Sequence, residues 1–343
     1  MAMTRPPADR LQRRLTINMG SPAQVHASNR SGDTGAIGSR LGDGRLHLHH
    51  GPIDLIIEAS GHAAAVRAAY SAAGRRFSGM LSELVQELAA LRTPIQDNPV
   101  VAGTTAMRMC RAAGQFRPNF ITPMAAVAGA VADEILASMR TVPGLRRIYV
   151  NNGGDISLWL AGNEAFRLGV IPDIGGRLSS DLPATVRLTA ASGVGGIATS
   201  GWRGRSQSLG IADSVTVFAI DATMADAAAT LIANAVNIDS PNVAREPAVA
   251  RSPDSDLGQR PVTIGVDPLS DRECLCALRA GAAVGTAMCS DARIIAAILF
   301  LQGEVMSVGD IPGGSRDSLT SLQTAAVSTW DRLGAIEYAR YRN

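Results

Sequence analysis

The chain of 343 residues contains no lysine, so all 32 of its basic residues are arginine. Schiff-base formation, a P-loop lysine and a lysine general base all need an amine on a flexible side chain. These three kinds of chemistry are therefore excluded for this chain. Aromatic residues are also few, at 4%. Because the chain has neither a basic block nor many rings for stacking on bases, we expect no nucleic-acid partner.

Cysteine is scarce as well, with four residues and no Cys-x-x-Cys pair. No histidine lies close to any of them in sequence, so the spacing of a zinc site is missing. We expect reduced thiols and a cytoplasmic protein. The N-terminus lacks the apolar segment of a signal peptide, and Asp133 and Glu134 interrupt the most apolar stretch, 121–139. We therefore expect no membrane span.

Hydrophobic residues make up 46% of the chain, enough for a sizeable core. Residues 1–44 are rich in Arg, Ser, Gly and Pro, which predicts a disordered or mobile N-terminal arm. Residues 45–310 mix helical and strand patterns without a regular βαβ rhythm. This favours one α+β domain, with antiparallel sheet regions flanked by helices. Residues 311–343 are weakly patterned and are interpreted as a C-terminal extension.

Hydrophobic periodicity gives the expected elements within that domain. Helices are predicted over 62–73, 80–91, 101–113, 122–139, 224–236 and 271–283. Strands are predicted over 45–50, 53–58, 147–151, 156–160, 166–171, 185–189, 214–220 and 262–266, with a hairpin around 302–303. Residues 239–261 contain four prolines and are predicted to form a long surface excursion.

A first segment with chemical potential is the Asn-Asn-Gly-Gly-Asp sequence between two predicted strands. Gly153 and Gly154 allow positive φ and the close approach of a ligand, and the Asp155 carboxylate is suited to a ribose hydroxyl or an amide. A plain hairpin turn is the alternative, because Asn-Gly and Gly-Asp are hairpin dipeptides.

A second segment, 192–210, has six glycines in nineteen residues. Its hydroxyls and amides precede Arg203 and Arg205, which share a face if the chain is extended there. Amide donors combined with bidentate arginines suit a phosphate or pyrophosphate. The alternative is a flexible surface loop.

A third segment places Asp226 and Thr230 four residues apart on one face of a predicted helix. A carboxylate and a hydroxyl in this arrangement form half of a Mg²⁺ site, because Mg²⁺ prefers oxygen ligands. Alternatively, the aspartate complements the helix dipole and the threonine is buried against its own backbone.

Taken in order, these segments resemble the ApbE-like superfamily, whose members include FAD:protein FMN transferases. The matching motifs are GGDI at 153–156, IATSG at 197–201, SVTV at 214–217 and ADAAAT at 225–230, preceded by VAGAVAD at 127–133. The chain is most similar to the cytoplasmic branch of that superfamily. The resemblance covers roughly residues 45–310, and its specificity comes from the collinear order of the motifs.

The resemblance implies an α+β fold that binds FAD, with Mg²⁺ near the pyrophosphate, and transfer of FMN to a Thr or Ser of a partner flavoprotein. It implies flavin-nucleotide contacts by Gly153, Gly154 and Asp155, and phosphate contacts by Thr199, Ser200 and Gly201. For Mg²⁺ it implies Asp226 and Thr230 as ligands, together with a main-chain carbonyl near Val127.

Two departures from the transferase pattern affect the expected chemistry. Ala128-Gly129 stands where the transferases have Lys-Gly, and their His-x-x-Asp-Pro segment is replaced by 204–213, which has no histidine. Asp213 is then the candidate base, and Arg203 and Arg205 are candidates for charge stabilisation. These changes also favour an alternative, a non-catalytic flavin- or pterin-binding protein in a cofactor or one-carbon pathway. Exposed sheet edges in such a fold favour a homodimer.

Overall fold

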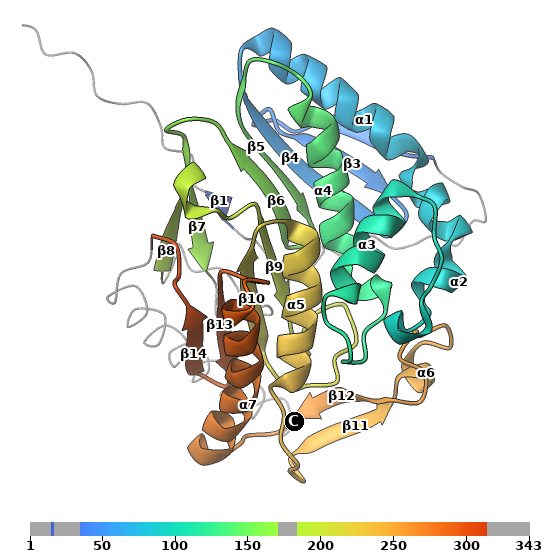
Figure 1. Cartoon of the computed structure of the whole chain (residues 1–343), viewed down its shortest axis with the longest axis vertical. Helices are drawn as coiled ribbons and strands as arrows, with labels where there is room; N and C mark the ends of the chain where they lie inside the picture. Colours follow the sequence, from blue (N-terminus) through green and yellow to red (C-terminus); the bar gives the residue numbers. More distant parts are fainter. Residues whose placement is uncertain (1–14, 17–34, 171–183, 314–343) are drawn as a thin grey trace, which may run out of the picture.

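The computed structural model describes residues 15–16, 35–170 and 184–313. Its centre is a nine-stranded sheet in the order β14-β13-β10-β9-β6-β5-β4-β3-β2, in which every neighbouring pair is antiparallel (Figure 1). The strands are β2 (Ile37–Arg40), β3 (Leu46–His50), β4 (Ile53–Gly61), β5 (Leu145–Asn152), β6 (Asp155–Leu160), β9 (Gly196–Ser200), β10 (Ser214–Ala219), β13 (Ala296–Leu301) and β14 (Glu304–Gly309).

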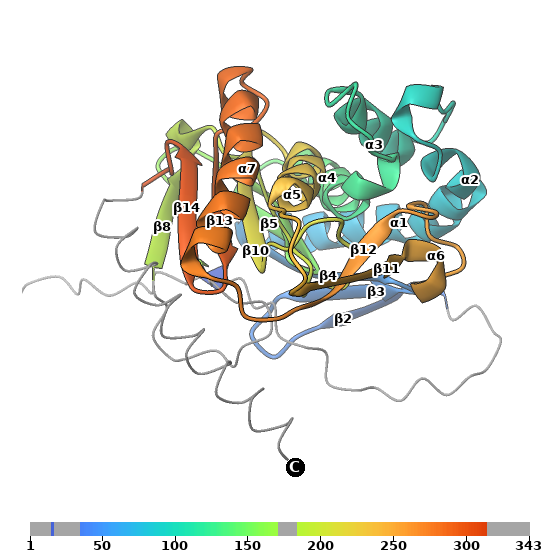
Figure 2. The same cartoon turned by 90° about the horizontal axis from the view of Figure 1, so that it is seen from below.

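Helices cover one face of this sheet, as Figure 2 shows. Those packed against its strands are α1 (Ala63–Gln86), α4 (Val127–Arg140), α5 (Ala222–Ala235) and α7 (Asp271–Ser290). The remaining helices are α2 (Leu88–Leu91), α3 (Thr104–Gly114) and α6 (Ala248–Arg251), with 3₁₀ turns η1 (Ile95–Asp97), η2 (Pro123–Ala126) and η3 (Ala190–Ser192). None of the described helices is both long enough and apolar enough to cross a membrane.

The two faces of the sheet bury different cores. On β13, Ala297, Leu299 and Leu301 belong to the large core under the helices. Their neighbours Ile298 and Phe300 belong to a second core that includes residues of a smaller sheet. The strands of that smaller sheet are β1 (Leu15–Thr16), β7 (Ala165–Val170) and β8 (Ala184–Thr189). Alternation along each strand therefore places the helices and the small sheet on opposite faces.

The architecture confirms the predicted α+β class with antiparallel sheets and flanking helices. The hairpin predicted around 302–303 is also present, with Gln302 and Gly303 at φ of 46° and 86° between β13 and β14. Helix α7 begins with a capping box, in which the Ser270 side chain accepts from the Glu273 amide and the Glu273 side chain accepts from the Ser270 amide.

The prediction of two helices over 62–73 and 80–91 is wrong, because α1 continues through Gly74 to Gln86. A glycine inside a helix costs only about 1 kcal/mol. Burial of Phe77 and Met80 outweighs that cost. Arg76 also holds the helix in place, through Glu83 at 2.9 Å and Glu134 of α4 at 3.0 Å.

Two further boundaries differ from the sequence prediction. Order begins before Arg45, because β2 lies inside the segment assigned to the N-terminal arm and pairs with β3 of the domain. The excursion over 239–261 contains β11 (Val243–Pro247) and α6, and β11 pairs with β12 (Pro261–Val266) in a two-stranded ribbon. Most of the predicted arm and C-terminal extension, residues 1–14, 17–34 and 314–343, lies outside the described residues.

Candidate functional site

The Gly153-Gly154 pair forms the turn between β5 and β6, with φ of 65° and 117°. The Gly154 amide donates to Asn151 Oδ1 at 2.9 Å, which closes the turn. The hairpin interpretation of this segment is thus correct, yet the turn also receives a distant side chain. A Cβ added to Gly153 would lie 2.0 Å from Nη2 of Arg205. Glycine at 153 therefore lets the arginine rest on the backbone of the turn.

Asp155 follows this turn and begins β6. Its Oδ1 accepts a hydrogen bond from the Thr199 amide of β9 at 3.2 Å. The Thr199 hydroxyl is instead 2.9 Å from the hydroxyl of Thr216 on β10. Thr199 therefore offers its main chain to Asp155, while its hydroxyl is bonded to the neighbouring strand.

Asp226 reaches the same region from α5. Its Oδ2 accepts from the amide of Gly129, near the start of α4, at 3.0 Å. The two helices touch through their backbones here, because a Cβ on Gly129 would lie 2.1 Å from the Ala222 carbonyl oxygen. One turn after Asp226, Thr230 is half-buried, and its hydroxyl makes no hydrogen bond to the residues that the structure describes.

The two carboxylates influence one another strongly. Burial raises the pKa of Asp155 to about 7, against the Thr199 hydrogen bond and the Arg205 charge. Burial also raises the pKa of Asp226 well above its ordinary value, and the negative charge of Asp155 raises it further, against the amides of Gly129 and Ala128. Both side chains are half-buried, so solvent and small solutes still reach them. This concentration of negative charge is suited to a cation.

The donors present fit magnesium better than zinc. Asp155, Asp226 and Thr230 supply two carboxylates and a hydroxyl, which are hard oxygen ligands. Within residues 15–16, 35–170 and 184–313, no three His, Cys, Asp or Glu side chains are grouped as a metal site. A bound cation would therefore complete its shell with main-chain, water and ligand oxygens, as Mg²⁺ commonly does. Val127, the first residue of α4, lies two residues from Gly129 at this end of the helix.

A family model described as "AbpE bacteria" matches residues 38–307 of the chain. The chain belongs to this ApbE-like family. It is 39% identical to a UPF0280 protein of Methanopyrus kandleri over 48% of this chain and 64% of that protein. It is 38% identical to a UPF0280 protein of Methanothermobacter thermautotrophicus over 47% of this chain and 60% of that protein. The aligned region thus spans less than two thirds of each of these relatives.

A solved structure is also similar, the apo form of the flavinyl transferase ApbE from Pseudomonas stutzeri. It is 13% identical, with a TM-score of 0.31, over 80% of this chain and 94% of that one. The fold class of the present chain rests on its own sheet topology. The family match confirms the resemblance drawn from the collinear motifs.

Two arginines of the ApbE-like chain that are close in sequence have different partners. Arg203 donates through Nε to Asp213 Oδ1 at 2.9 Å. Arg205 instead packs on Gly153, and its positive charge lowers the pKa of Asp155. Residues 202–206 form turns and bends, so the extended chain that would give the arginines a common face is not observed. The structure brings Arg205 close to Asp155 and pairs Arg203 with Asp213.

Asp213 is buried and highly bonded. Besides Arg203, it accepts from the Trp202 indole at 3.3 Å and from the Gln302 amide at 2.5 Å. Burial raises its pKa, and the Arg203 charge opposes that shift. Its Oδ1 thus accepts two hydrogen bonds and its Oδ2 one, so Oδ2 keeps a lone pair for a further proton.

The Thr-Ser-Gly motif at 199–201 packs against the backbone of Asp213. A Cβ on Gly201 would lie 2.4 Å from the Asp213 carbonyl oxygen, so this glycine permits close packing of two chain segments. Ser200, just before it, is the last residue of β9 and is half-buried.

Three residues that hold the elements of the site together were not predicted as site residues from the sequence. Asp133 ties α4 to the start of α5. Asn152 Nδ2 donates to the Ala128 carbonyl at 3.1 Å and fixes the β5 end against α4. Gln207 accepts from Ser255 Oγ at 2.5 Å and donates to the Ala248 carbonyl at 2.9 Å, so the 239–261 excursion supports the segment that follows Arg203 and Arg205. Only Asp133 carried a sequence signal, because it ends the VAGAVAD motif.

Proposed function

We propose that this chain is a Mg²⁺-assisted transferase that binds a flavin dinucleotide and passes its FMN part to an acceptor protein. Membership of the ApbE-like family supports this proposal, as does the name of the similar Pseudomonas stutzeri protein. The observation that carries it is the convergence of Asp155 and Asp226 beside Arg205 and the Gly153 turn. A pyrophosphate with a bound cation complements these charges.

In this proposal, each part of the site has a separate task. Gly153, Gly154 and Asp155 line the nucleotide, and Thr199, Ser200 and Gly201 hold its phosphates. Arg205 adds a cation beside the phosphates from its exposed position. Asp226 and Thr230 hold Mg²⁺, together with a main-chain oxygen near Val127. When bound, the metal neutralises charge that develops on a pyrophosphate oxygen.

The proposed reaction exchanges one phosphorus–oxygen bond for another. The hydroxyl oxygen of an acceptor Ser or Thr bonds to the phosphorus of the FMN part, and the bond to the bridging pyrophosphate oxygen breaks. AMP leaves, and the hydroxyl proton passes to a base. Asp213 is our candidate base, with Arg203 beside it. Asp213 accepts two hydrogen bonds at Oδ1 and one at Oδ2, so the proton of the acceptor would go to the remaining lone pair of Oδ2.

Thermal melting with FAD, with and without Mg²⁺, tests the binding half of the proposal. Ligand binding to the native state raises Tm by mass action. We expect an FAD shift that grows with Mg²⁺ in the wild type and no Mg²⁺ increment in Asp226→Asn. Asp239→Asn, which changes an exposed carboxylate after α5, is the matched control and should keep the increment. An unchanged increment in Asp226→Asn would overturn the metal assignment.

Mass spectrometry of Thr-containing acceptor peptides incubated with FAD and Mg²⁺ tests the transfer. The expected product gains the mass of FMN minus water. Asp213→Asn should bind FAD as the wild type does, yet transfer at least about 100-fold more slowly. Binding of FAD without any transfer would instead support the flavin-binding alternative, which the missing family lysine and histidine favour.

A further inference from the structure

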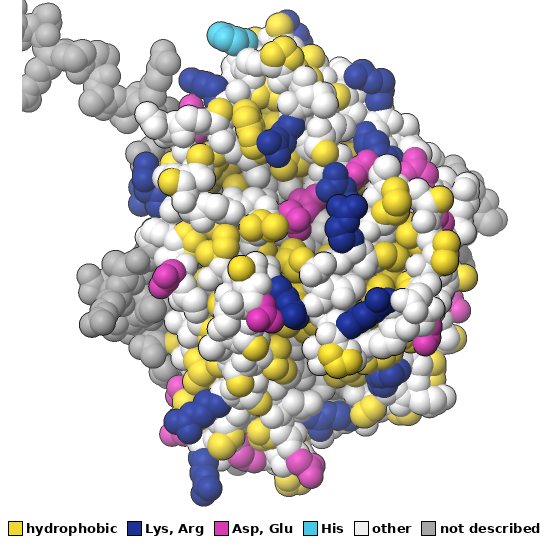
Figure 3. All heavy atoms as spheres, in the orientation of Figure 1, with side chains coloured by type: hydrophobic (Ala, Val, Ile, Leu, Met, Phe, Trp, Pro, Cys, Tyr) yellow, Lys and Arg dark blue, Asp and Glu magenta, His cyan; other side chains and the backbone are white. Residues whose placement is uncertain are grey.

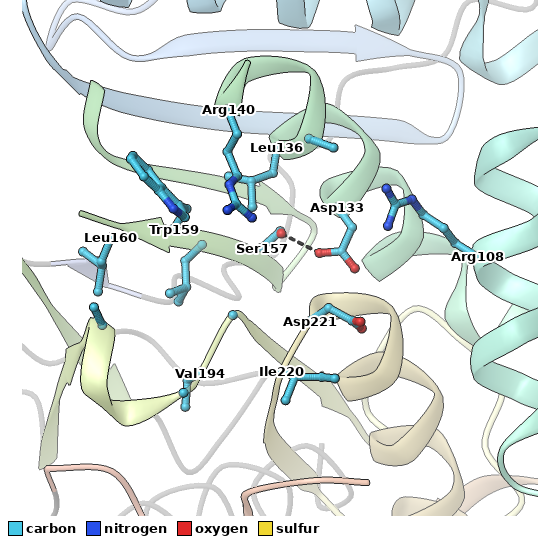
Figure 4. Close-up of a pocket in the computed structure, with 15 residues that line it drawn as sticks. Arg108, Asp133, Leu136, Arg140, Ser157, Trp159, Leu160, Val194, Ile220 and Asp221 are labelled. Atoms are coloured by element: carbon cyan, nitrogen blue, oxygen red, sulfur yellow. Dashed lines mark hydrogen bonds between the residues drawn. The ribbon is translucent and has the colours of Figure 1, made fainter. Parts of the chain in front are cut away.

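A cavity of about 320 Å³ lies between α4, β6, the η3–β9 connection and the start of α5 (Figure 4). Along α4 it extends from Asp133 to Arg140, toward the opposite end of the helix from Val127. Arg140 comes eleven positions after Gly129 in this helix, a rise of about 16 Å. Ligand pockets commonly measure about 300–1,000 Å³. This cavity is therefore large enough for a single ring system but too small for a dinucleotide.

One basic side chain of the cavity is available for a ligand. Arg140 is exposed, and its guanidinium lies 5.6 Å from the centre of the Trp159 ring. It forms no hydrogen bond or ion pair with any other residue that the structure describes. Arg108, also in the lining, differs because its Nε is 2.9 Å from Glu134 Oε2. Of these two arginines, Arg108 is thus paired with a carboxylate among the described residues, and Arg140 is not.

The acidic side chains of the cavity show the same contrast. Asp133 accepts from Ser157, from the Ala222 amide and from both the amide and hydroxyl of Thr223. Its oxygens are thus already used by the protein, and it lines the cavity as a structural residue. Asp221 accepts from the Met224 amide at Oδ1, at 2.7 Å. Its Oδ2 has no hydrogen bond to the residues described here. In Figure 4, Asp221 and Arg140 approach the cavity from different sides.

Between these charges the lining is apolar. Val194 is buried, Trp159 is half-buried, and Ile220 is 65% exposed although it is a large aliphatic residue. Figure 3 shows acidic and basic side chains next to apolar ones over the central helices on this face of the molecule. A flat ring placed between Trp159 and Ile220 would cover apolar surface that water now reaches.

We propose that this cavity binds a small molecule with a flat apolar ring that carries both an amino group and an acid group, the chemistry of an aromatic amino acid. The acid group pairs with Arg140, the amino group with Asp221 Oδ2, and the ring packs on Trp159. A simple anion would face Asp133 and Asp221 without compensation, and an uncharged ring would leave Arg140 and Asp221 unpaired. The inference does not depend on the proposed flavin chemistry.

Fluorine NMR with 4-fluoro-L-phenylalanine as the probe tests this inference on the full chain. We expect saturable broadening of the probe signal with the wild type. Loss of either charged group, in 3-(4-fluorophenyl)propanoate or 4-fluorophenethylamine, should weaken binding by about tenfold, since each ion pair contributes about that factor. Equal binding of all three probes would overturn the assignment of the charged partners, and no saturable binding would overturn the site.

Four variants separate this site from general effects. Arg140→Gln removes the exposed guanidinium, and Asp221→Asn removes the charge but keeps an N-cap oxygen for Met224. Each should weaken binding of 4-fluoro-L-phenylalanine by about tenfold. Arg108→Gln should leave it unchanged because Glu134 already occupies that arginine. Asp226→Asn should also leave it unchanged, so a failure of the flavin proposal remains distinguishable. Wild-type affinity in both Arg140→Gln and Asp221→Asn would refute the proposal.

Discussion

Two carboxylates on neighbouring helices, Asp133 of α4 and Asp226 of α5, have raised pKa values because both are enclosed by the protein. Asp133 is 6% exposed and accepts four side-chain or main-chain hydrogen bonds. Asp226 is half-buried, accepts from the start of α4, and lies close enough to Asp155 for their charges to repel. Burial alone therefore does not distinguish a structural carboxylate from a functional one.

The difference lies in how far the protein itself satisfies each carboxylate. The oxygens of Asp133 are taken by Ser157 and by the start of α5, so no ligand is needed. The Asp155–Asp226 pair has too few donors for its charge, and an added cation would stabilise it. The comparison predicts large folding effects at Asp133 and small ones at the carboxylate pair.

Asp133→Ala should have the largest effect, lowering the free energy of unfolding by about 4 kcal/mol. It leaves the buried amides of Ala222 and Thr223 without their acceptor. Urea denaturation measures this loss. Asp221→Asn, at the same helix end, is the control and should change stability by less than about 0.5 kcal/mol because asparagine also caps helices. Similar losses in the two variants would contradict the special position of Asp133.

Gly129→Ala should come next, with a loss of about 3 kcal/mol. The added Cβ meets the Ala222 backbone and pushes α4 away from α5, which also displaces the amide that donates to Asp226. Gly74→Ala is the matched control, because a Cβ at that helical glycine meets no atom within 4 Å. It should stabilise the protein by up to about 1 kcal/mol. If both variants are stabilised, the close helix contact is wrong.

Asp155→Asn should have the smallest effect, and its sign depends on pH. The folded pKa of about 7 exceeds the ordinary value of 3.8, so the folded state binds this proton more tightly than the unfolded state. Wild-type stability should therefore fall, relative to Asp155→Asn, as pH rises from about 4 to 7, and then level off. The difference should be about 1 kcal/mol, because solvent screens a half-buried group. Unfolding in EDTA across this range measures it, and parallel curves would contradict it.

Much of the fold followed from the sequence. Strand alternation predicted β3–β6, and the Gln302-Gly303 pair predicted the β13–β14 turn. The failures arose where a local signal competed with packing. Gly74 indicates a break, but burial of Phe77 carries α1 through it. Prolines in 239–261 suggest an irregular loop, but Pro247 and Pro261 lie at the end and start of paired strands.

The candidate site was only partly predictable for the same reason. Its motifs identified Gly153, Asp155 and Asp226 as residues suited to a nucleotide or a cation. The spacing of residues did not predict that Arg205 contacts Gly153 while Arg203 pairs with Asp213. It also did not predict that the Thr199 amide, rather than its hydroxyl, donates to Asp155. These choices depend on a turn at 202–206 and on which strands are neighbours.

The sequence by itself determined the absence of lysine chemistry, the mixed helical and strand content, and the glycine turns that admit close contacts. These properties depend on residue type and on neighbours within a few positions. Only the tertiary structure decided which carboxylates meet, because the Gly129 amide and Asp226 are 97 residues apart. It also decided that Arg140 and Asp221 border one cavity. Such meetings depend on sheet order and helix packing, which join segments whose separation in sequence carries no local signal.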